Sequence, residues 1–214
     1  MPRNRLVHGI SLATGSVLLA ATALVAAGGT AQAALPTPIA ASTARSYLSG
    51  MSATSETHAS TYDRNLFPTW ITISGTCNTR EYILKRDGSN VTTDSACQAT
   101  SGSWSSAYDG VTTTAPSTFD IDHVVPLAEA WASGAWAWST SARQGFANDV
   151  TRPQLIAVSA SSNRSKGDSD PAEWLPRASF QCTYARAWVQ VKHYYGLTVD
   201  SAEKSALSGI LSGC

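Results

Sequence analysis

The most regular pattern of apolar residues lies near the end of the chain, over residues 178–195. Apolar side chains recur there at spacings of four, four, three and four residues, at Phe180, Tyr184, Trp188, Val191 and Tyr195. Residues at these spacings share one face of a helix, and Gly196 follows at the place where a helix commonly ends. The pattern predicts a helix over 178–195.

A last helix is predicted to begin near Asp200. Asp200 and Glu203 have the spacing of a capping box, in which two side chains bond the free backbone groups of the first turn. Apolar residues then follow at helical spacing, at Ala206, Leu207, Ile210 and Leu211.

Short apolar runs elsewhere predict strands. We expect strands over 120–125, where Pro126 ends the run, over 154–159 and over 80–88. A short helix is predicted over 127–134, and the polar turn over 159–168 can open another. Residues 87–118 are rich in Ser, Thr and Gly and are expected to be mostly turns and irregular backbone.

These elements favour an α+β fold, a small mixed domain with short antiparallel strands packed against C-terminal helices. We expect this domain to span 56–214. Residues 34–55 are expected to form a flexible segment before it, mobile over 35–46, with a possible short helix over 44–51.

The first 33 residues have the form of a secretory signal peptide. Arg3 and Arg5 give a basic start, an apolar run follows over 10–27, and Ala31-Gln32-Ala33 has the small residues of a cleavage site. A membrane anchor is disfavoured because the run is short and interrupted by Gly and Thr. We therefore predict a secreted, extracellular protein without a membrane anchor.

The charge balance limits the ways in which the protein can bind polyanions. Of the 15 basic residues, Arg3 and Arg5 lie in the predicted signal peptide, which leaves 13 against 15 acidic residues and a formal charge of −2. Binding to nucleic acid would therefore depend on a local cluster of cationic side chains or on a bound metal cation.

Four cysteines follow the predicted signal peptide, and in an exported chain they predict two disulfides. Three pairings are possible. We favour Cys77–Cys97 and Cys182–Cys214, because each closes a local loop. A zinc site is disfavoured, since the chain has no C-x-x-C pair.

His123 is the candidate for chemistry. Of the three histidines after the predicted signal peptide, it alone is flanked by acidic residues and lies at the end of a predicted strand, in the run FDIDHVVP (119–126). A half-buried structural histidine would fit this run equally well. A second segment, over 146–168, favours a site because it adds Asn148, another strand and Asn163.

Together these segments resemble the HNH endonucleases, which carry a ββα-metal core. The resemblance rests on DHVVP (122–126), Asn148, LIAV (155–158) and NRSKGD (163–168). More narrowly, CNTREY (77–82), DIDHVVPLAEAW (120–131) and DPAEWLP (170–176) resemble secreted bacterial proteins of this kind.

The resemblance implies roles for individual residues. His123 would be the general base that activates water, and Asp122 and Asn163 would bind one divalent cation, Mg²⁺ or Mn²⁺. Adjacent strand residues point to opposite faces, so Asp122 and His123 converge only if the strand ends or is distorted there. Asn148 would hold the loop that positions the histidine.

Other polar residues are expected near this site. Lys166, Arg164 and Arg80 are candidates for contacting phosphate, and a solvated turn is the alternative for the first two. Asp120 and Glu81 are expected to act through neighbouring residues. Asp120 would tune the metal or form a hydrogen bond with the histidine. The alternative for Asp120 is an acidic residue that only stabilises a turn.

The sequence therefore predicts a monomeric, secreted, metal-dependent endonuclease acting on DNA without strong sequence specificity, with RNA left open as a further substrate. The alternative is a non-catalytic secreted binding protein that retains the fold.

Overall fold

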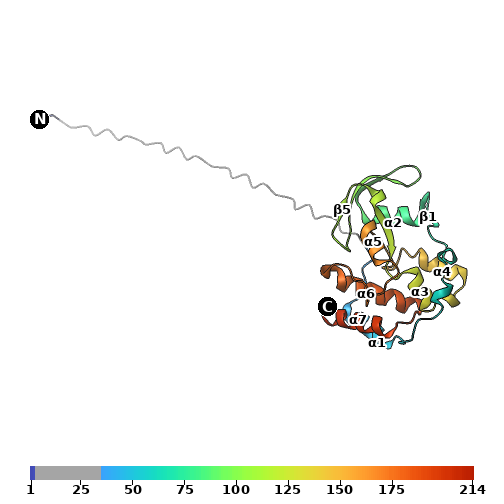
Figure 1. Ribbon diagram of the computed structural model, residues 1–214. Coiled ribbons are helices and arrows are strands. Elements are labelled where there is room, and N and C mark those ends of the chain that lie inside the picture. Colours follow the sequence, from blue (N-terminus) through green and yellow to red (C-terminus); the bar gives the residue numbers. More distant parts are fainter. Residues whose placement is uncertain (3–34) are drawn as a thin grey trace.

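The computed structural model describes residues 1–2 and 35–214, and the predicted signal peptide lies almost entirely outside this range (Figure 1). The α-helices are α1 (Ala41–Gly50), α2 (Thr79–Asp87), α3 (Leu127–Ala132), α4 (Thr140–Ala147), α5 (Ala160–Lys166), α6 (Ala178–Tyr195) and α7 (Ser201–Ser212). The strands are β1 (Thr72–Ser74), β2 (Cys77–Asn78), β3 (Ser89–Thr93), β4 (Ala99–Ser105), β5 (Thr112–Thr113), β6 (Phe119–His123) and β7 (Leu155–Ser159). Four short 3₁₀ helices connect them, η1 (Ala59–Thr61), η2 (Arg64–Leu66), η3 (Pro116–Thr118) and η4 (Ala135–Ala137).

The strands predicted around His123 and Leu155 pair with each other. β6 and β7 are antiparallel, with Phe119 opposite Ser159 and His123 opposite Leu155. The chain then enters α5 directly, because the Ser159 side chain accepts a hydrogen bond from the backbone N–H of Ser162 and caps the helix. Two strands and a helix thus form a ββα unit, and the predicted α+β class is confirmed.

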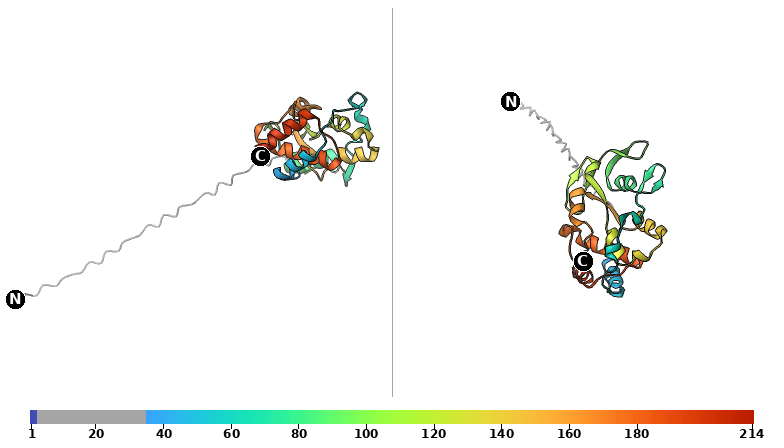
Figure 2. Two further views of the ribbon diagram at one scale, coloured as in Figure 1. Left: turned by 90° about the horizontal axis from the view of Figure 1, so that it is seen from below. Right: turned by 45° about the vertical axis from the view of Figure 1, so that its right-hand side comes forward.

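The two faces of this hairpin pack against different layers, because successive strand residues point to opposite sides. Ile156 and Val158 join a core with α1, α6 and α7, whereas Leu155 and Ala157 join a second core with α2. Figures 1 and 2 show these two layers at opposite ends of the molecule, with α1, α6 and α7 together at one end.

The predicted C-terminal helices are confirmed. α6 spans the predicted residues and ends at Gly196, which adopts a left-handed φ of 66°. α7 begins with the capping box formed by Asp200 and Glu203. The disulfide Cys182–Cys214 joins the two helices, and the favoured pairing of all four cysteines is confirmed. In the described part of the chain, no helix is long and apolar enough to cross a membrane.

The segment expected to be flexible before the domain is instead part of its core. α1 packs against α6 and α7 with Ala44 and Leu48 buried, and the Gln190 side chain accepts a hydrogen bond from the backbone N–H of Ile39 at 2.9 Å. The apolar positions of 35–55 are few, so their burial depends on the helices from the far end of the chain.

The strand predicted over 80–88 is also wrong, because these residues form α2. The Asn78 side chain caps the helix by accepting from the backbone N–H of Glu81. Ile83 and Leu84 are both buried although they are neighbours, which a strand with one buried face does not allow. The prediction rested on the alternation of Tyr82 and Leu84 with Ile83 and Lys85, and four residues are too few to distinguish the period of a strand from that of a helix.

The polar stretch over 87–118 is more regular than predicted. It contains a three-stranded antiparallel sheet in the order β3-β4-β5. Hydroxyl groups support the pairing, as between Thr92 Oγ1 and Ser101 Oγ at 2.6 Å. Trp104 packs against α2 and donates its indole N–H to the Leu84 carbonyl at 2.8 Å. The sheet thus closes the second core with one large aromatic side chain.

Candidate functional site

A pocket of about 350 Å³ lies along β6 and the second half of α5. It combines residues that are far apart in the sequence, since it also includes η2 and the turn after α5. Its polar lining consists of Arg64, Asp122, His123, Asn163, Arg164 and Asp168. Three of the four residues predicted as catalytic therefore lie in one pocket, together with one of the predicted phosphate ligands.

The ring of His123 is held in place through its Nε2 atom. Nε2 lies 2.9 Å from the carbonyl oxygen of Ala147. A carbonyl only accepts hydrogen bonds, so Nε2 carries the proton in the neutral ring and Nδ1 keeps its lone pair. Within the described chain Nδ1 has no hydrogen-bond partner, and the indole of Trp70 stacks on the ring at a centroid distance of 5.7 Å. The ring is thus fixed in one orientation with one nitrogen free to accept a proton.

The surroundings of His123 keep it neutral. Burial lowers its pKa from 6.5 to about 3, and the positive charges of Arg64 and Lys166 act in the same direction. The hydrogen bond to Ala147 opposes these effects and does not outweigh them. The lone pair on Nδ1 is therefore available at neutral pH.

Asp122 points to the other side of β6, as the alternation of strand residues requires. One carboxylate oxygen lies 2.9 Å from Nζ of Lys166, and the other accepts a hydrogen bond from the hydroxyl of Tyr108 at 2.5 Å. Lys166 also donates to the His123 carbonyl at 2.8 Å. The carboxylate is thus fixed by two buried donors.

This arrangement corrects the role predicted for Lys166. Its side chain is 1% exposed and directed toward Asp122, so it does not reach a phosphate in the pocket. Lys166 lies on the buried face of α5. The sequence of this helix is mostly polar and therefore did not indicate that Lys166 is buried.

Asp120 and Asn163 form a second pair beside the pocket. The Asn163 side-chain amide donates to a carboxylate oxygen of Asp120 at 3.1 Å. This bond orients the Asn163 carbonyl oxygen away from Asp120, and no residue of the described chain donates a hydrogen bond to that oxygen. Asp120 makes no hydrogen bond to His123, so its contact is with the predicted metal ligand.

Asn148 lies outside the pocket and connects several segments. Its carbonyl oxygen accepts from Thr79 Oγ1 at 2.6 Å and from the Ile71 N–H at 3.2 Å. Its amide donates to the carbonyls of Pro68 and Gln144 at 2.7 and 2.8 Å. Because Ala147 is its neighbour, these bonds also fix the carbonyl that holds His123. The geometry supports the positioning role predicted for Asn148.

Two arginines give the pocket its positive charge. Arg164 is exposed and makes no ion pair or hydrogen bond to any residue of the described chain. Arg64 is also exposed. The sequence did not predict Arg64, Trp70 or Tyr108 as residues of the site. They come from segments without a recognisable motif, so only tertiary contacts place them here.

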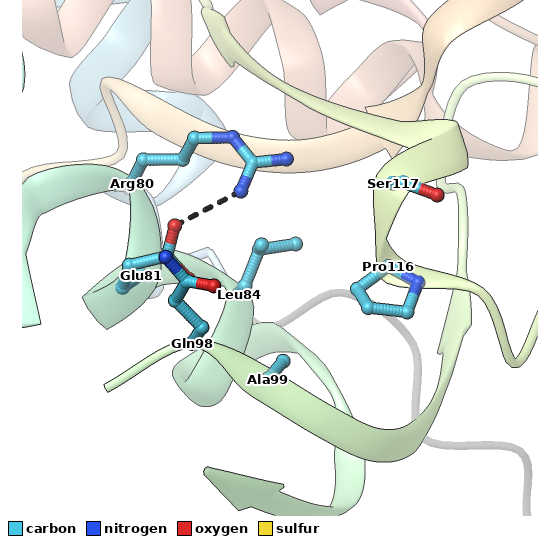
Figure 3. A pocket seen from close by; sticks show the side chains of 7 residues that line it. All are labelled: Arg80, Glu81, Leu84, Gln98, Ala99, Pro116 and Ser117. Atoms are coloured by element: carbon cyan, nitrogen blue, oxygen red, sulfur yellow. Dashed lines mark hydrogen bonds and ion pairs between the residues drawn. The ribbon is translucent and has the colours of Figure 1, made fainter. Parts of the chain in front are cut away.

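Arg80 and Glu81 do not line the His123 pocket, contrary to expectation. They lie on α2 beside another pocket of about 300 Å³, whose far wall is Pro116 and Ser117 (Figure 3). The Arg80 guanidinium lies 3.1 Å from Glu81 and donates to the Phe119 carbonyl at 3.3 Å.

The chain belongs to the family described as GmrSD restriction endonucleases, C-terminal domain, which matches residues 77–210. The match covers the ββα unit, both disulfide-bonded segments except Cys214, and all the predicted site residues. The family places the protein among nuclease-related domains.

A relative from Arthroderma benhamiae, named "Uncharacterized secreted protein", is 56% identical over 184 residues, which are 84% of this chain and 90% of the relative. Its name and the two disulfides found here agree with the predicted extracellular location. No solved structure matches the chain.

Proposed function

We propose that the protein is a secreted endonuclease of the HNH type that hydrolyses phosphodiester bonds of DNA without strong sequence specificity. The observation that carries this proposal is the orientation of His123. Its Nε2–H bonds a fixed carbonyl 2.9 Å away, which leaves Nδ1 unprotonated, and the residue lines a pocket together with two arginines. This is the geometry of a general base beside an anion site.

In the proposed reaction, Nδ1 of His123 accepts a proton from a water molecule as the water attacks the phosphorus. The P–O bond to one sugar oxygen breaks as the new P–O bond forms, and the leaving sugar oxygen takes a proton from solvent. The positive charge that develops on the imidazole is stabilised by the Ala147 carbonyl. Arg64 and Arg164 bind the phosphate oxygens and offset their growing negative charge. Lys166 holds the carboxylate of Asp122 in place and does not contact the substrate.

Asp122 and Asn163 fit the binding of one divalent cation, Mg²⁺ or Mn²⁺. Both residues line the same pocket, and the Asn163 amide nitrogen is the end of its side chain that bonds Asp120, so its carbonyl oxygen is available as a ligand. Each carboxylate oxygen of Asp122 keeps a lone pair beyond the bond to Lys166 or Tyr108. Oxygen ligands suit these hard cations, which would supply further charge neutralisation at the phosphate.

The lack of sequence specificity follows from the binding groups. The pocket presents arginines and oxygen atoms suited to phosphate, and phosphate contacts carry no sequence information. RNA shares the same phosphodiester group and is a further proposed substrate.

Digestion of supercoiled plasmid by the chain lacking residues 1–33 tests this proposal. We expect nicking and then linear fragments with Mg²⁺ or Mn²⁺, and intact plasmid with EDTA. His123→Ala and His123→Asn should abolish cleavage. His193→Ala is the matched control, because His193 is exposed on α6 and stacks on Tyr47 away from the pocket.

Intact plasmid with folded, oxidised wild-type protein and either metal would contradict the proposal. One observation favours the alternative of a non-catalytic binding protein: Lys166 already neutralises Asp122. In that case the same protein should retard the plasmid in a gel without cleaving it.

A further inference from the structure

We propose that a single nucleic-acid strand extends from the His123 pocket along β6 to the pocket beside Arg80, and that the Arg80 pocket binds a base of that strand. This inference rests on the proposed function. It assigns a second binding site, remote from the cleaved bond, to the two α2 residues that do not reach His123.

Three adjoining pockets connect the two ends. The His123 pocket shares Arg164 with a middle pocket of about 450 Å³, which in turn shares Ser117 with the Arg80 pocket. The middle pocket lies where β6 begins and β7 ends, and Phe119 lines it. The Arg80 guanidinium donates to the carbonyl of the same residue. The three pockets are therefore neighbours on the surface, each sharing one residue with the next.

The middle pocket suits a phosphodiester backbone. Its lining contains one cation, Arg164, and no acidic residue. Most of its other polar groups are hydroxyls, such as those of Thr112, Ser117 and Ser161, which donate hydrogen bonds to phosphate or sugar oxygens. Arg164 has no partner in the described chain and can reach a phosphate without breaking an ion pair.

The Arg80 pocket suits a base better than a phosphate. Leu84, Ala99 and Pro116 provide apolar surface for the faces of a ring (Figure 3). Glu81, Gln98 and Ser117 provide acceptors and donors for its edge. The carboxylate of Glu81 neutralises Arg80 and would repel a phosphate. Since Arg80 uses two of its five N–H groups for Glu81 and Phe119, it keeps donors for a base.

Two of the segments that line the Arg80 pocket are joined covalently. Cys77 precedes α2, Cys97 precedes Gln98, and the two cysteines form a disulfide. The disulfide thereby restrains the position of Gln98 and Ala99 relative to α2.

The length of β6 sets the length of strand required. Phe119 and His123 are four residues apart, or about 13 Å along a strand. A single strand stacked as in a duplex rises about 3.4 Å per nucleotide, so this distance corresponds to roughly four nucleotides of a stacked strand. Oligonucleotides shorter than this would reach only one end.

Binding of fluorescein-labelled single-stranded DNA, followed by fluorescence anisotropy, tests the inference. All measurements use the full chain after residue 33 with His123→Ala, in Mg²⁺, so that the strand is not cleaved. Arg80→Gln should weaken binding of an oligonucleotide of roughly 12 nucleotides by about tenfold, equivalent to about 1.4 kcal/mol. It should weaken binding of a trinucleotide less than about twofold.

The matched control is Lys85→Gln, which removes one positive charge from the exposed side of the same helix. It should change binding of either DNA by less than about twofold, as for an exposed charge outside the contact surface.

The salt dependence of binding distinguishes the proposed phosphate contact of Arg164 from the proposed base contact of Arg80. Arg164→Gln should lower the slope of log Kd against log salt by about 0.7, as for one phosphate contact. Arg80→Gln should leave this slope unchanged.

Equal effects of Arg80→Gln and Lys85→Gln, or equal losses for short and long DNA, would overturn the inference. So would the absence of binding to the longer DNA. The plasmid digestion is independent of these results. Cleavage with equal effects of the two variants would reject the base pocket and retain the proposed function, whereas neither binding nor cleavage would reject both.

Discussion

Lys166 and Asp122 form a buried ion pair at the centre of the ββα unit, with Nζ 2.9 Å from the carboxylate. Burial raises the pKa of Asp122 and lowers that of Lys166, although each charge favours the other. Desolvation therefore outweighs the attraction within the pair. Such a pair contributes little net stability, yet it is costly to break because the remaining charge stays buried.

Lys166→Met should accordingly lower the free energy of unfolding by about 3–5 kcal/mol, the usual cost of leaving one buried charge unpaired. Urea denaturation measures the change. The double variant Lys166→Met/Asp122→Asn removes both charges and keeps an acceptor for Tyr108, so it should recover part of the loss. A double variant no more stable than the single one would contradict this account.

The stability of the protein should depend on the protonation of His123. The ordinary pKa of a histidine is 6.5, and burial is the main cause that lowers the pKa of His123 to about 3 in the folded chain. Between these values the unfolded chain binds a proton that the folded chain does not, so acidification below about pH 6.5 favours unfolding, by at most about 1.4 kcal/mol per pH unit. Urea denaturation from pH 7 to 4.5 measures this slope. His123→Asn should lose this part of the slope, and parallel curves for the two proteins would contradict it.

Glu203 should give a pH dependence of the opposite sign. Its side chain is fully buried, and burial with the nearby charge of Glu129 raises its pKa from 4.5 to about 7, against the effect of Lys192. The folded chain then binds the proton more tightly, so this contribution is present at low pH and is lost as the pH rises through about 7. It amounts to at most about 3 kcal/mol.

Glu203→Gln tests the contribution of Glu203, because glutamine keeps hydrogen-bonding atoms and does not titrate. Thermal unfolding between pH 5 and 8 should show that the wild type loses stability relative to the variant as the pH rises. A difference between the two proteins that stays constant with pH would assign the effect to other groups.

Asn148→Ala should reduce both stability and proposed cleavage although Asn148 does not line the pocket. The substitution leaves four buried or partly buried partners without their bonds, among them Ile71 and Thr79. A cost of about 1–3 kcal/mol is expected for such a loss. Because Ala147 would also shift, the kcat of plasmid cleavage should fall, and KM should change less than kcat. Full activity with lowered stability would show that Asn148 does not position His123.

Removing the second disulfide should destabilise the packing of α6 and α7. Cys182 and Cys214 are 32 positions apart in the sequence, and Cys182→Ser/Cys214→Ser should lower the free energy of unfolding by about 3–4 kcal/mol. Urea denaturation under oxidising conditions checks this value. Plasmid cleavage at room temperature should persist, since neither cysteine contacts the pocket.

Local sequence patterns predicted the elements whose stability is local. The helix over 178–195 and the capped helix after Asp200 were confirmed because apolar spacing and capping act within a few residues. The strands around His123 and Leu155 were confirmed, and almost every residue in both is buried. Residues 80–88 were predicted as a strand but form a helix. The Asn78 cap and the burial of Ile83 and Leu84 in the second core stabilise the helix, and the local alternation did not indicate either contact.

The candidate site was predictable to the extent that it consists of adjacent residues. DIDH and NRSK placed His123, Asp122 and Asn163 together, since a hairpin and the next helix meet. The surroundings were not predictable. Arg64, Trp70 and Tyr108 approach the hairpin from segments without a motif, and Lys166 turns inward to Asp122.

The sequence by itself therefore determined the ββα unit, the terminal helices, the pairing of cysteines within each half and the position of His123. These depend on periodicity and on contacts between near neighbours in the chain. Tertiary structure alone decided that Ala147 selects the tautomer of His123, that Lys166 neutralises Asp122 and that Arg80 lies in a different pocket. Each of these depends on the direction of a side chain relative to a distant segment, which burial and desolvation fix only when the layers pack.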